Sequence, residues 1–245
     1  MLTRILAALA LLTRIPVRRP FSTKELTQAT PFLPLIGALV GVAQEFVLHL
    51  LAPFLPPLLL SVSLLAVAAC LTGALHLDGL ADTADGFGGG HSREETLRIM
   101  RDPAIGTYGA VAVMLMLMAR ASALSTLIEQ RAAGPFLLLA PALSRWTMVA
   151  LGHALSYARP EEGLGSLAGT VTRRQLALAT AITAAVSVAA RGQYAIAAWG
   201  AAIGVTVICG RIFARRLGGF TGDTLGTNSE LTEAAVLVTG VVLSR

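Results

Sequence analysis

The chain is patterned as long apolar runs separated by short polar segments. A membrane-spanning helix needs about 20 largely apolar residues, and four runs meet that length, while two more are slightly short and the last is marginal. The seven runs cover residues 31–51, 57–76, 107–128, 134–155, 175–190, 193–210 and 231–243. The pattern predicts an all-α, polytopic integral membrane helix bundle of about six or seven transmembrane helices. The last run is either a seventh span or a segment buried within the protein.

The first 30 residues are predicted to lie at the membrane interface. Their apolar stretch, residues 5–12, is too short to cross a bilayer, is followed by Arg14 and has no small-residue cleavage pattern nearby. It is therefore interpreted as an interfacial helix and not as a signal peptide. We expect a single membrane-embedded domain over residues 1–245, with an interfacial segment at 1–30 and polar segments at 77–106 and 211–233.

Composition supports the membrane prediction. The chain is 55% hydrophobic and only 13% charged, against about 25% charged residues in a soluble domain. Cys70 and Cys209 both lie in apolar runs, which favours packing roles over a disulfide or a metal site. The net charge of +5 could indicate nucleic acid, but the 19 basic residues are scattered. We therefore expect contact with a lipid bilayer and no nucleic-acid partner.

The basic residues indicate an orientation. If the N-terminus is cytoplasmic, 14 of the 19 Lys and Arg residues fall on the inner side, and only Arg131, Arg191 and Arg245 fall on the outer side. Cytoplasmic loops carry an excess of Lys and Arg. The bias predicts a multi-pass protein of the cytoplasmic (inner) membrane whose two polar segments both face the cytoplasm.

Four of the five aspartates of the chain lie close together, at Asp78, Asp82, Asp85 and Asp102. The first three follow i, i+4, i+7 spacing, so they share one face of a helix. Like charges at this spacing repel, and a cation reverses that effect. Carboxylate oxygens are the ligands that Mg²⁺ prefers, and Mg²⁺ usually binds together with substrate phosphates. The cluster predicts a Mg²⁺ site for a phosphate-bearing substrate, with a solvated cytoplasmic face as the alternative.

Glycines follow the aspartates and are expected to end this helix. Their backbone N–H groups could cradle a phosphate, although glycine-rich turns are common. The glycines are Gly86, Gly88, Gly89 and Gly90. Ser92 and Glu95 then have capping-box spacing, which predicts a short helix that Pro103 stops.

Cationic side chains come next, at Arg93, Arg98 and Arg101. Arginines beside a metal site are expected where both bind one phosphoryl group. His76 and His91 flank the cluster, and each is interpreted as a polar interfacial residue, with a metal role as the less favoured alternative.

The second polar segment contains the fifth aspartate, Asp223, among glycines. It is either a turn residue or, as we prefer, a ligand that completes the metal site. Thr227 and Glu230 have capping-box spacing, so Glu230 either starts the last helix or is a further metal ligand.

Two arginines, Arg120 and Arg145, fall within predicted spans. A charge there costs about 2.5 kcal/mol or more at the bilayer centre, so such residues are functional or paired. Glu45 is a candidate partner for one of them. We expect Arg145 to face the substrate and Arg120 to be either functional or a structural partner.

Four segments carry a family resemblance. LLTRIPV, HLDGLADTADGFGGG, IMRDPAIGTYG and GGFTGDTLGTNSELTE together resemble cobalamin synthase, the adenosylcobinamide-GDP ribazoletransferase family of bacteria and archaea. The resemblance implies a polytopic membrane enzyme that needs Mg²⁺ and joins adenosylcobinamide-GDP to α-ribazole or its 5′-phosphate. A ribose hydroxyl would attack the cobinamide-linked phosphate, and GMP would leave. Homo-oligomerisation is left open.

The family's motifs correspond here to Asp78, Asp82, Asp85, Arg101, Asp102 and Asp223. The resulting hypothesis assigns catalysis to Asp82, Asp85 and Asp102. It assigns metal binding to Asp78, Asp82, Asp85, Asp223 and Glu230. It assigns substrate binding to Arg101, Arg145, Gly88, Gly89 and Thr107.

Two other classes share some of these features. A membrane phosphotransferase of the CDP-alcohol type also places aspartates at a cytoplasmic helix end, but its AR dipeptide and second aspartate pair are missing here. A cation transporter would hold its acidic residues near the bilayer midplane, whereas these are predicted at the cytoplasmic edge.

Overall fold

The computed structural model describes residues 1–159, 164–190 and 193–244, and within these ranges the protein is helical without β-strands. One isolated β-bridge pairs Tyr157 with Phe220. The elements, in chain order, are α1 (Leu2–Leu12), α2 (Thr23–Thr27), η1 (Thr30–Phe32), α3 (Leu33–Leu51), α4 (Pro57–Thr72), α5 (Leu75–Gly89), α6 (Arg93–Ile99), α7 (Thr107–Glu129), α8 (Ala133–Ala154), η2 (Leu164–Thr170), α9 (Arg173–Ala189), α10 (Ala195–Leu217) and α11 (Gly222–Leu243). The predicted all-α class is confirmed.

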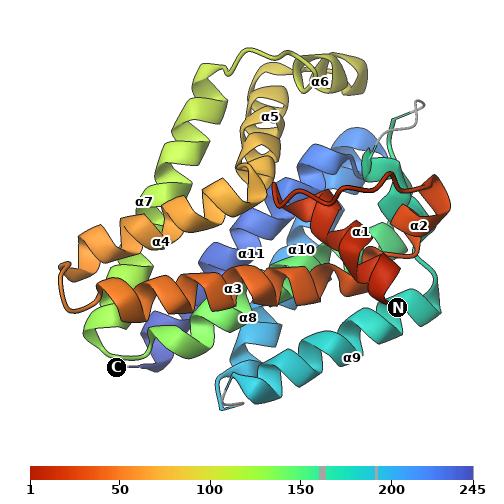
Figure 1. Cartoon of the computed structure of the whole chain (residues 1–245). Helices are drawn as coiled ribbons and strands as arrows, with labels where there is room; N and C mark the ends of the chain where they lie inside the picture. Colours follow the sequence, from red (N-terminus) through yellow and green to blue (C-terminus); the bar gives the residue numbers. More distant parts are fainter. Residues whose placement is uncertain (160–163, 191–192, 245) are drawn as a thin grey trace.

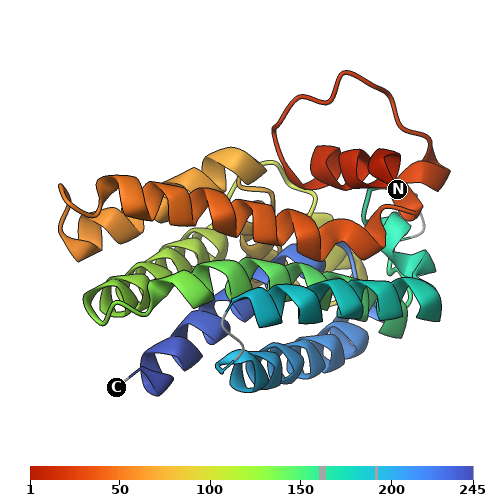
Figure 2. The ribbon, with the colours of Figure 1, turned by 60° about the horizontal axis from the view of Figure 1, so that its bottom comes forward.

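The long helices form a bundle with apolar outer faces. Figure 2 shows α3, α8 and α9 running nearly parallel, with α10 below them, at the edge of the bundle opposite α3. Large apolar side chains point outward from it, among them Phe46, Met118 and Ile196, which are 68%, 68% and 88% exposed. Exposed apolar surface of this kind suits a lipid environment and would be unfavourable in water.

The membrane bundle is confirmed with fewer spans than the six or seven expected. Within the described residues, four segments are long and apolar enough to cross a membrane: Thr30–Leu51, α7, α8 and α10. The bent pair α4 and α5 would make a fifth if counted as one span. By contrast, α9 has only 17 residues, and α11 carries Asp223, Glu230 and Glu233.

The predicted span at residues 57–76 is interrupted before its end. α4 ends at Thr72, and Gly73 and Ala74 both adopt left-handed backbone, with φ of 64° and 56°. The chain then bends by 91° into α5, which leads away toward α6 in Figure 1. We therefore treat α5 as lying outside the spanning segments. The bend turns the aspartate-bearing helix against α11.

The last helix begins earlier than the sequence predicts. α11 starts at Gly222, where Thr221 and Thr224 form a reciprocal capping box. The predicted cap at Thr227 and Glu230 is wrong, because the Thr227 hydroxyl donates to the carbonyl oxygen of Gly79 on α5 (3.0 Å). Most side chains of α11 from Thr224 to Gly240 are buried. α11 is therefore a central helix of the bundle, and it ends at the opposite side of the molecule from α1 (Figure 1).

Candidate active site

The two polar segments meet where α5 packs against the first turns of α11. A Cβ atom on Gly79 would lie 2.7 Å from the carbonyl oxygen of Asp223, so only glycine permits this approach. The hydrogen bond from Thr227 to Gly79 fixes the same contact. Residues more than 140 positions apart in the chain are thereby brought together, as the sequence hypothesis required.

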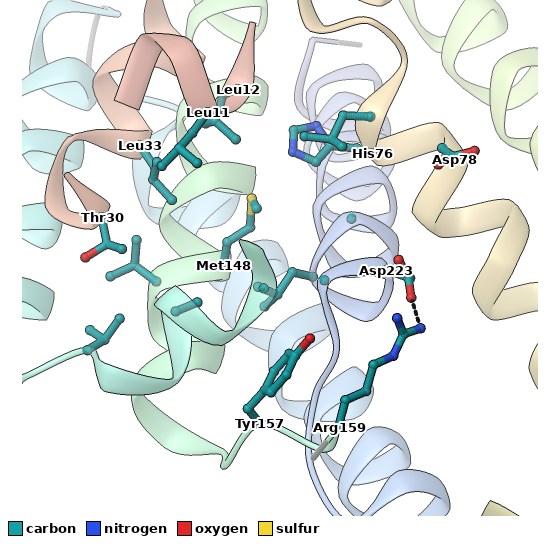
Figure 3. Close-up of a pocket in the computed structure, with 18 residues that line it drawn as sticks. Leu11, Leu12, Thr30, Leu33, His76, Asp78, Met148, Tyr157, Arg159 and Asp223 are labelled. Carbon is teal, nitrogen blue, oxygen red and sulfur yellow. Dashed lines mark hydrogen bonds and ion pairs between the residues drawn. The ribbon is translucent and has the colours of Figure 1, made fainter. Parts of the chain in front are cut away.

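A cavity of about 340 Å³ opens beside this contact. Figure 3 shows Leu11, Leu12 and Leu33 on one side of it, facing His76 and Asp78 on the other. Asp223, Arg159 and Tyr157 line its lower part in that view. The cavity therefore has an apolar wall from α1, α3 and α8 and a charged rim from α5 and α11.

Arg159 is a site residue that the sequence analysis did not find. Its guanidinium donates to Asp223 at 2.6 Å, and its Nε atom is buried without a partner among the described residues. The backbone pairs Ala158 with Phe220 (2.8 Å) and Phe220 with Ser156 (3.0 Å), which carries Arg159 to the start of α11. No local sequence motif indicates that Arg159 pairs with Asp223, so its positive charge was the only sequence feature that pointed to a role.

Three aspartates concentrate negative charge at or next to the rim: Asp78 and Asp223 line the cavity, whereas Asp82 is not among its lining residues but is close enough to both for their charges to affect it. Burial raises the pKa of Asp82 to about 7, and the carboxylates of Asp223 and Asp78 act in the same direction. Burial also raises the pKa of Asp223, against the lowering influence of Arg159. The carboxylates of Asp78, Asp82 and Asp223 thus interact with one another, and a cation at the rim would relieve their repulsion.

Asp85 lies on the same face of α5 as Asp78 and Asp82, but its carboxylate makes different contacts. Its two oxygens accept the backbone N–H groups of Gly106 (2.7 Å) and Gly109 (2.8 Å), so it caps the N-terminus of α7 from another helix. Thr107 is the first residue of that helix and is exposed. Each oxygen of Asp85 already accepts one backbone N–H, which gives this carboxylate a structural role, and its assignments to metal binding and catalysis stay predictions.

The glycines after the aspartates do not form the expected phosphate cradle. Gly88 and Gly89 lie inside α5, which ends at Gly89, so helix termination there is confirmed. A Cβ atom on Gly88 would lie 2.5 Å from the Tyr108 ring, so this glycine allows side-chain packing. Arg216 also donates to the carbonyl oxygens of Phe87 (2.7 Å) and Gly90 (3.3 Å), closing the end of the helix.

The charged residues in and just after α6 do not gather at one site. Arg101 is exposed and close enough to Asp223 to lower its pKa. Asp102 is exposed, and its carboxylate accepts the N–H of Ala104 (3.0 Å). Asp102 is absent from the described lining of the cavity, and its catalytic assignment stays a prediction. Arg93 instead anchors α6, because it donates to the carbonyl oxygen of Leu217 (2.8 Å).

Glu230 and Arg145 belong to a buried ion-pair network and not to the rim. Arg120 pairs with Glu230 and Glu233, and Arg145 pairs with Glu233. These four side chains are at most 6% exposed. This corrects the metal assignment of Glu230 and the substrate-facing assignment of Arg145, because each is neutralised by an internal partner. The expected pairing with Glu45 is not seen, since Glu45 lies beside Gly134.

The residues at the rim fit a metal ion in part. Three hard carboxylates from two helices are the donors that suit Mg²⁺. In the described part of the chain, however, no three acidic, histidine or cysteine side chains are grouped closely enough to share an ion. Binding there would require Asp78, Asp82 and Asp223 to move together.

Comparison with known proteins gives consistent matches over most of the chain. The profile of the family described as cobalamin-5-phosphate synthase matches residues 4–241. The chain is 40% identical over 238 residues to an adenosylcobinamide-GDP ribazoletransferase of Syntrophobacter fumaroxidans, covering 94% of each. It is also 40% identical over 247 residues to the enzyme of that name from Pseudomonas aeruginosa, covering 97% of each. No solved structure matches the chain.

Proposed function

Because the chain belongs to the cobalamin-5-phosphate synthase family, we propose that it joins adenosylcobinamide-GDP to α-ribazole or its 5′-phosphate, with release of GMP. The observation that carries this proposal is the meeting of α5 and α11. It brings Asp78 and Asp223 to the rim of one cavity, beside Arg159. Transfer at phosphorus depends mostly on positioning and on neutralising charge, and this rim offers groups for both.

We propose Mg²⁺ as the cofactor, held by Asp78, Asp82 and Asp223. When bound, the ion would neutralise the diphosphate and the leaving phosphate. Mg²⁺ usually takes one or two protein carboxylates and completes its shell with water and substrate phosphates, so three carboxylates are sufficient. The raised pKa of Asp82 is consistent with this proposal: burial is its largest cause, and the nearby carboxylates of Asp223 and Asp78 raise it further.

The protein's own side chains have separate tasks in this proposal. Arg159 orients Asp223, and its buried, unpartnered Nε–H is available to a phosphate oxygen. Arg101, near Asp223, adds positive charge for the diphosphate. The attacking hydroxyl gives its proton to a carboxylate at the rim. That acceptor is sought among Asp78, Asp82 and Asp223, since Asp85 already accepts two N–H groups.

We also propose that this site faces the cytoplasm of a bacterial inner membrane. The cavity is lined by Leu11 and Leu12 of α1, next to the basic residues of the N-terminal segment. An excess of positive charge marks the cytoplasmic end of membrane proteins. Accessibility of a cysteine placed in the loop before α7, probed from either side of oriented vesicles, tests this orientation.

The function itself is tested with purified protein in detergent. Mg²⁺, adenosylcobinamide-GDP and α-ribazole are added, and GMP is measured, with a chelator control and a parallel reaction on α-ribazole 5′-phosphate. GMP release that needs both Mg²⁺ and the nucleoside supports the proposal. Folded protein that releases no GMP with either acceptor contradicts it, and Mg²⁺ flux into liposomes would favour a transporter.

A further inference from the structure

His76 stands in the first turn of α5 and lines the cavity, yet none of the roles above uses it. It is only 3% exposed. Its Nδ1 atom lies 3.2 Å from Nη2 of Arg145. Figure 3 shows the ring on the side of the cavity that faces Leu11 and Leu12.

The contact with Arg145 determines which ring nitrogen carries the proton. A guanidinium can only donate, so Nδ1 of His76 must accept and the neutral ring is protonated at Nε2. Nε2 is buried and has no hydrogen-bond partner among the described residues. A buried N–H donor without a partner is unfavourable, so a hydrogen-bond acceptor on a bound ligand would offset the desolvation cost of the Nε2–H.

The buried ion-pair network holds this arrangement in place. Arg145 is fixed by Glu233 and by the Ser144 hydroxyl (2.8 Å), and Glu233 also binds Arg120. The network has two positive and two negative side chains, so it carries no net charge toward the cavity. The ring therefore offers a neutral, oriented donor.

The size and lining of the cavity indicate that it suits the acceptor nucleoside better than adenosylcobinamide-GDP. At about 340 Å³ it lies near the lower end of the range for ligand pockets, roughly 300–1,000 Å³. That volume suits a nucleoside and is too small for a corrinoid that also carries GDP. Leu33, Met148 and Val149 provide an apolar wall for a flat base, while Asp78 and Asp223 lie at the opposite rim, where a ribose hydroxyl must react.

We propose that this cavity binds the acceptor nucleoside and that the Nε2–H of His76 donates a hydrogen bond to it. The base packs against the apolar wall, and the ribose points to the aspartates. The inference rests on the proposed function for the identity of the nucleoside, α-ribazole. His76 is thereby assigned as a substrate-binding residue.

Kinetics of two substitutions test this assignment. In His76→Leu the donor is lost, and KM for α-ribazole should rise about fivefold to tenfold while KM for adenosylcobinamide-GDP changes less than about twofold. His76→Gln retains an N–H near the Nε2 position and should recover most of the loss. His49→Gln, at an exposed site on α3, is the matched control. A folded His76→Leu protein with unchanged KM for α-ribazole, or with both KM values raised equally, overturns the inference.

A second measurement does not depend on variants that fold or on turnover. In ¹⁵N-histidine-labelled wild-type protein, His76 should show the Nε2-protonated tautomer, and α-ribazole alone should shift its Nε2 resonance. An Nδ1-protonated ring, or no shift at saturating α-ribazole, overturns the inference. If instead the shift is seen but wild-type protein releases no GMP, the proposed function fails and the nucleoside site stands.

Discussion

Glu233 is the residue on which the buried network depends most. It binds both Arg120 and Arg145, whereas Glu230 binds only Arg120. Glu233→Gln keeps the shape of the side chain but leaves two buried arginines with a single carboxylate. Breaking a buried ion pair in this way costs about 3–5 kcal/mol, because an uncompensated charge remains inside the protein.

The expected loss is large enough to measure by thermal unfolding. For a chain of this size each kcal/mol shifts Tm by about 2–4 °C, so Glu233→Gln should lower Tm by roughly 6–20 °C. Unfolding in detergent can be followed by the fluorescence of Trp146 and Trp199, whose rings lie 4.5 Å apart.

The controls separate this effect from a general loss of charge. Glu129→Gln, on the exposed end of α7, should change stability by less than about 0.5 kcal/mol. Glu230→Gln should fall between the two, since it removes one of the three ion pairs. A Glu233→Gln protein as stable as Glu129→Gln would refute the network as a source of stability.

Three further predictions concern α5 and its contacts. Mg²⁺ affinity should fall as pH is lowered through about 7, because the raised pKa of Asp82 means that its carboxylate takes up a proton there; equal affinities at pH 6 and pH 8 in a titration would contradict this. Asp85→Asn should lower the free energy of unfolding by about 1–2 kcal/mol through loss of the α7 cap, and it should leave Mg²⁺ affinity unchanged. A loss of Mg²⁺ affinity without a loss of stability would instead indicate that Asp85 is a metal ligand. Gly88→Ala should destabilise the protein through contact with Tyr108, and Tyr108→Ala should restore it, so additive losses in the double variant would exclude this contact.

The sequence predicts local features of this site well. The spacing of Asp78, Asp82 and Asp85 indicates a helix with three carboxylates on one face, and α5 contains all three and ends at Gly89. Apolar run length likewise locates α7 and α8 to within a few residues. These features depend on neighbours within a few turns, which periodicity and glycine placement report directly.

Features that depend on distant partners could not be predicted in this way. Asp85 caps a helix that begins more than 20 residues later, and no pattern distinguishes it from Asp82. The capping-box spacing at Glu230 was misleading, because Arg120 and α5 supply partners that a local pattern cannot reveal. Arg159 reaches the site only through backbone pairing near Phe220. Tertiary contacts decided each of these roles.

The most direct test of the central claim is the rate of Mg²⁺-dependent GMP release by Asp223→Asn protein. Asp223 lies on α11, far in sequence from the α5 aspartates, and it joins them only through the fold. If the two helices form one site, the rate should fall at least about a hundredfold, with wild-type elution in detergent and with Glu129→Gln unaffected. A folded Asp223→Asn protein that keeps the wild-type rate would contradict the account.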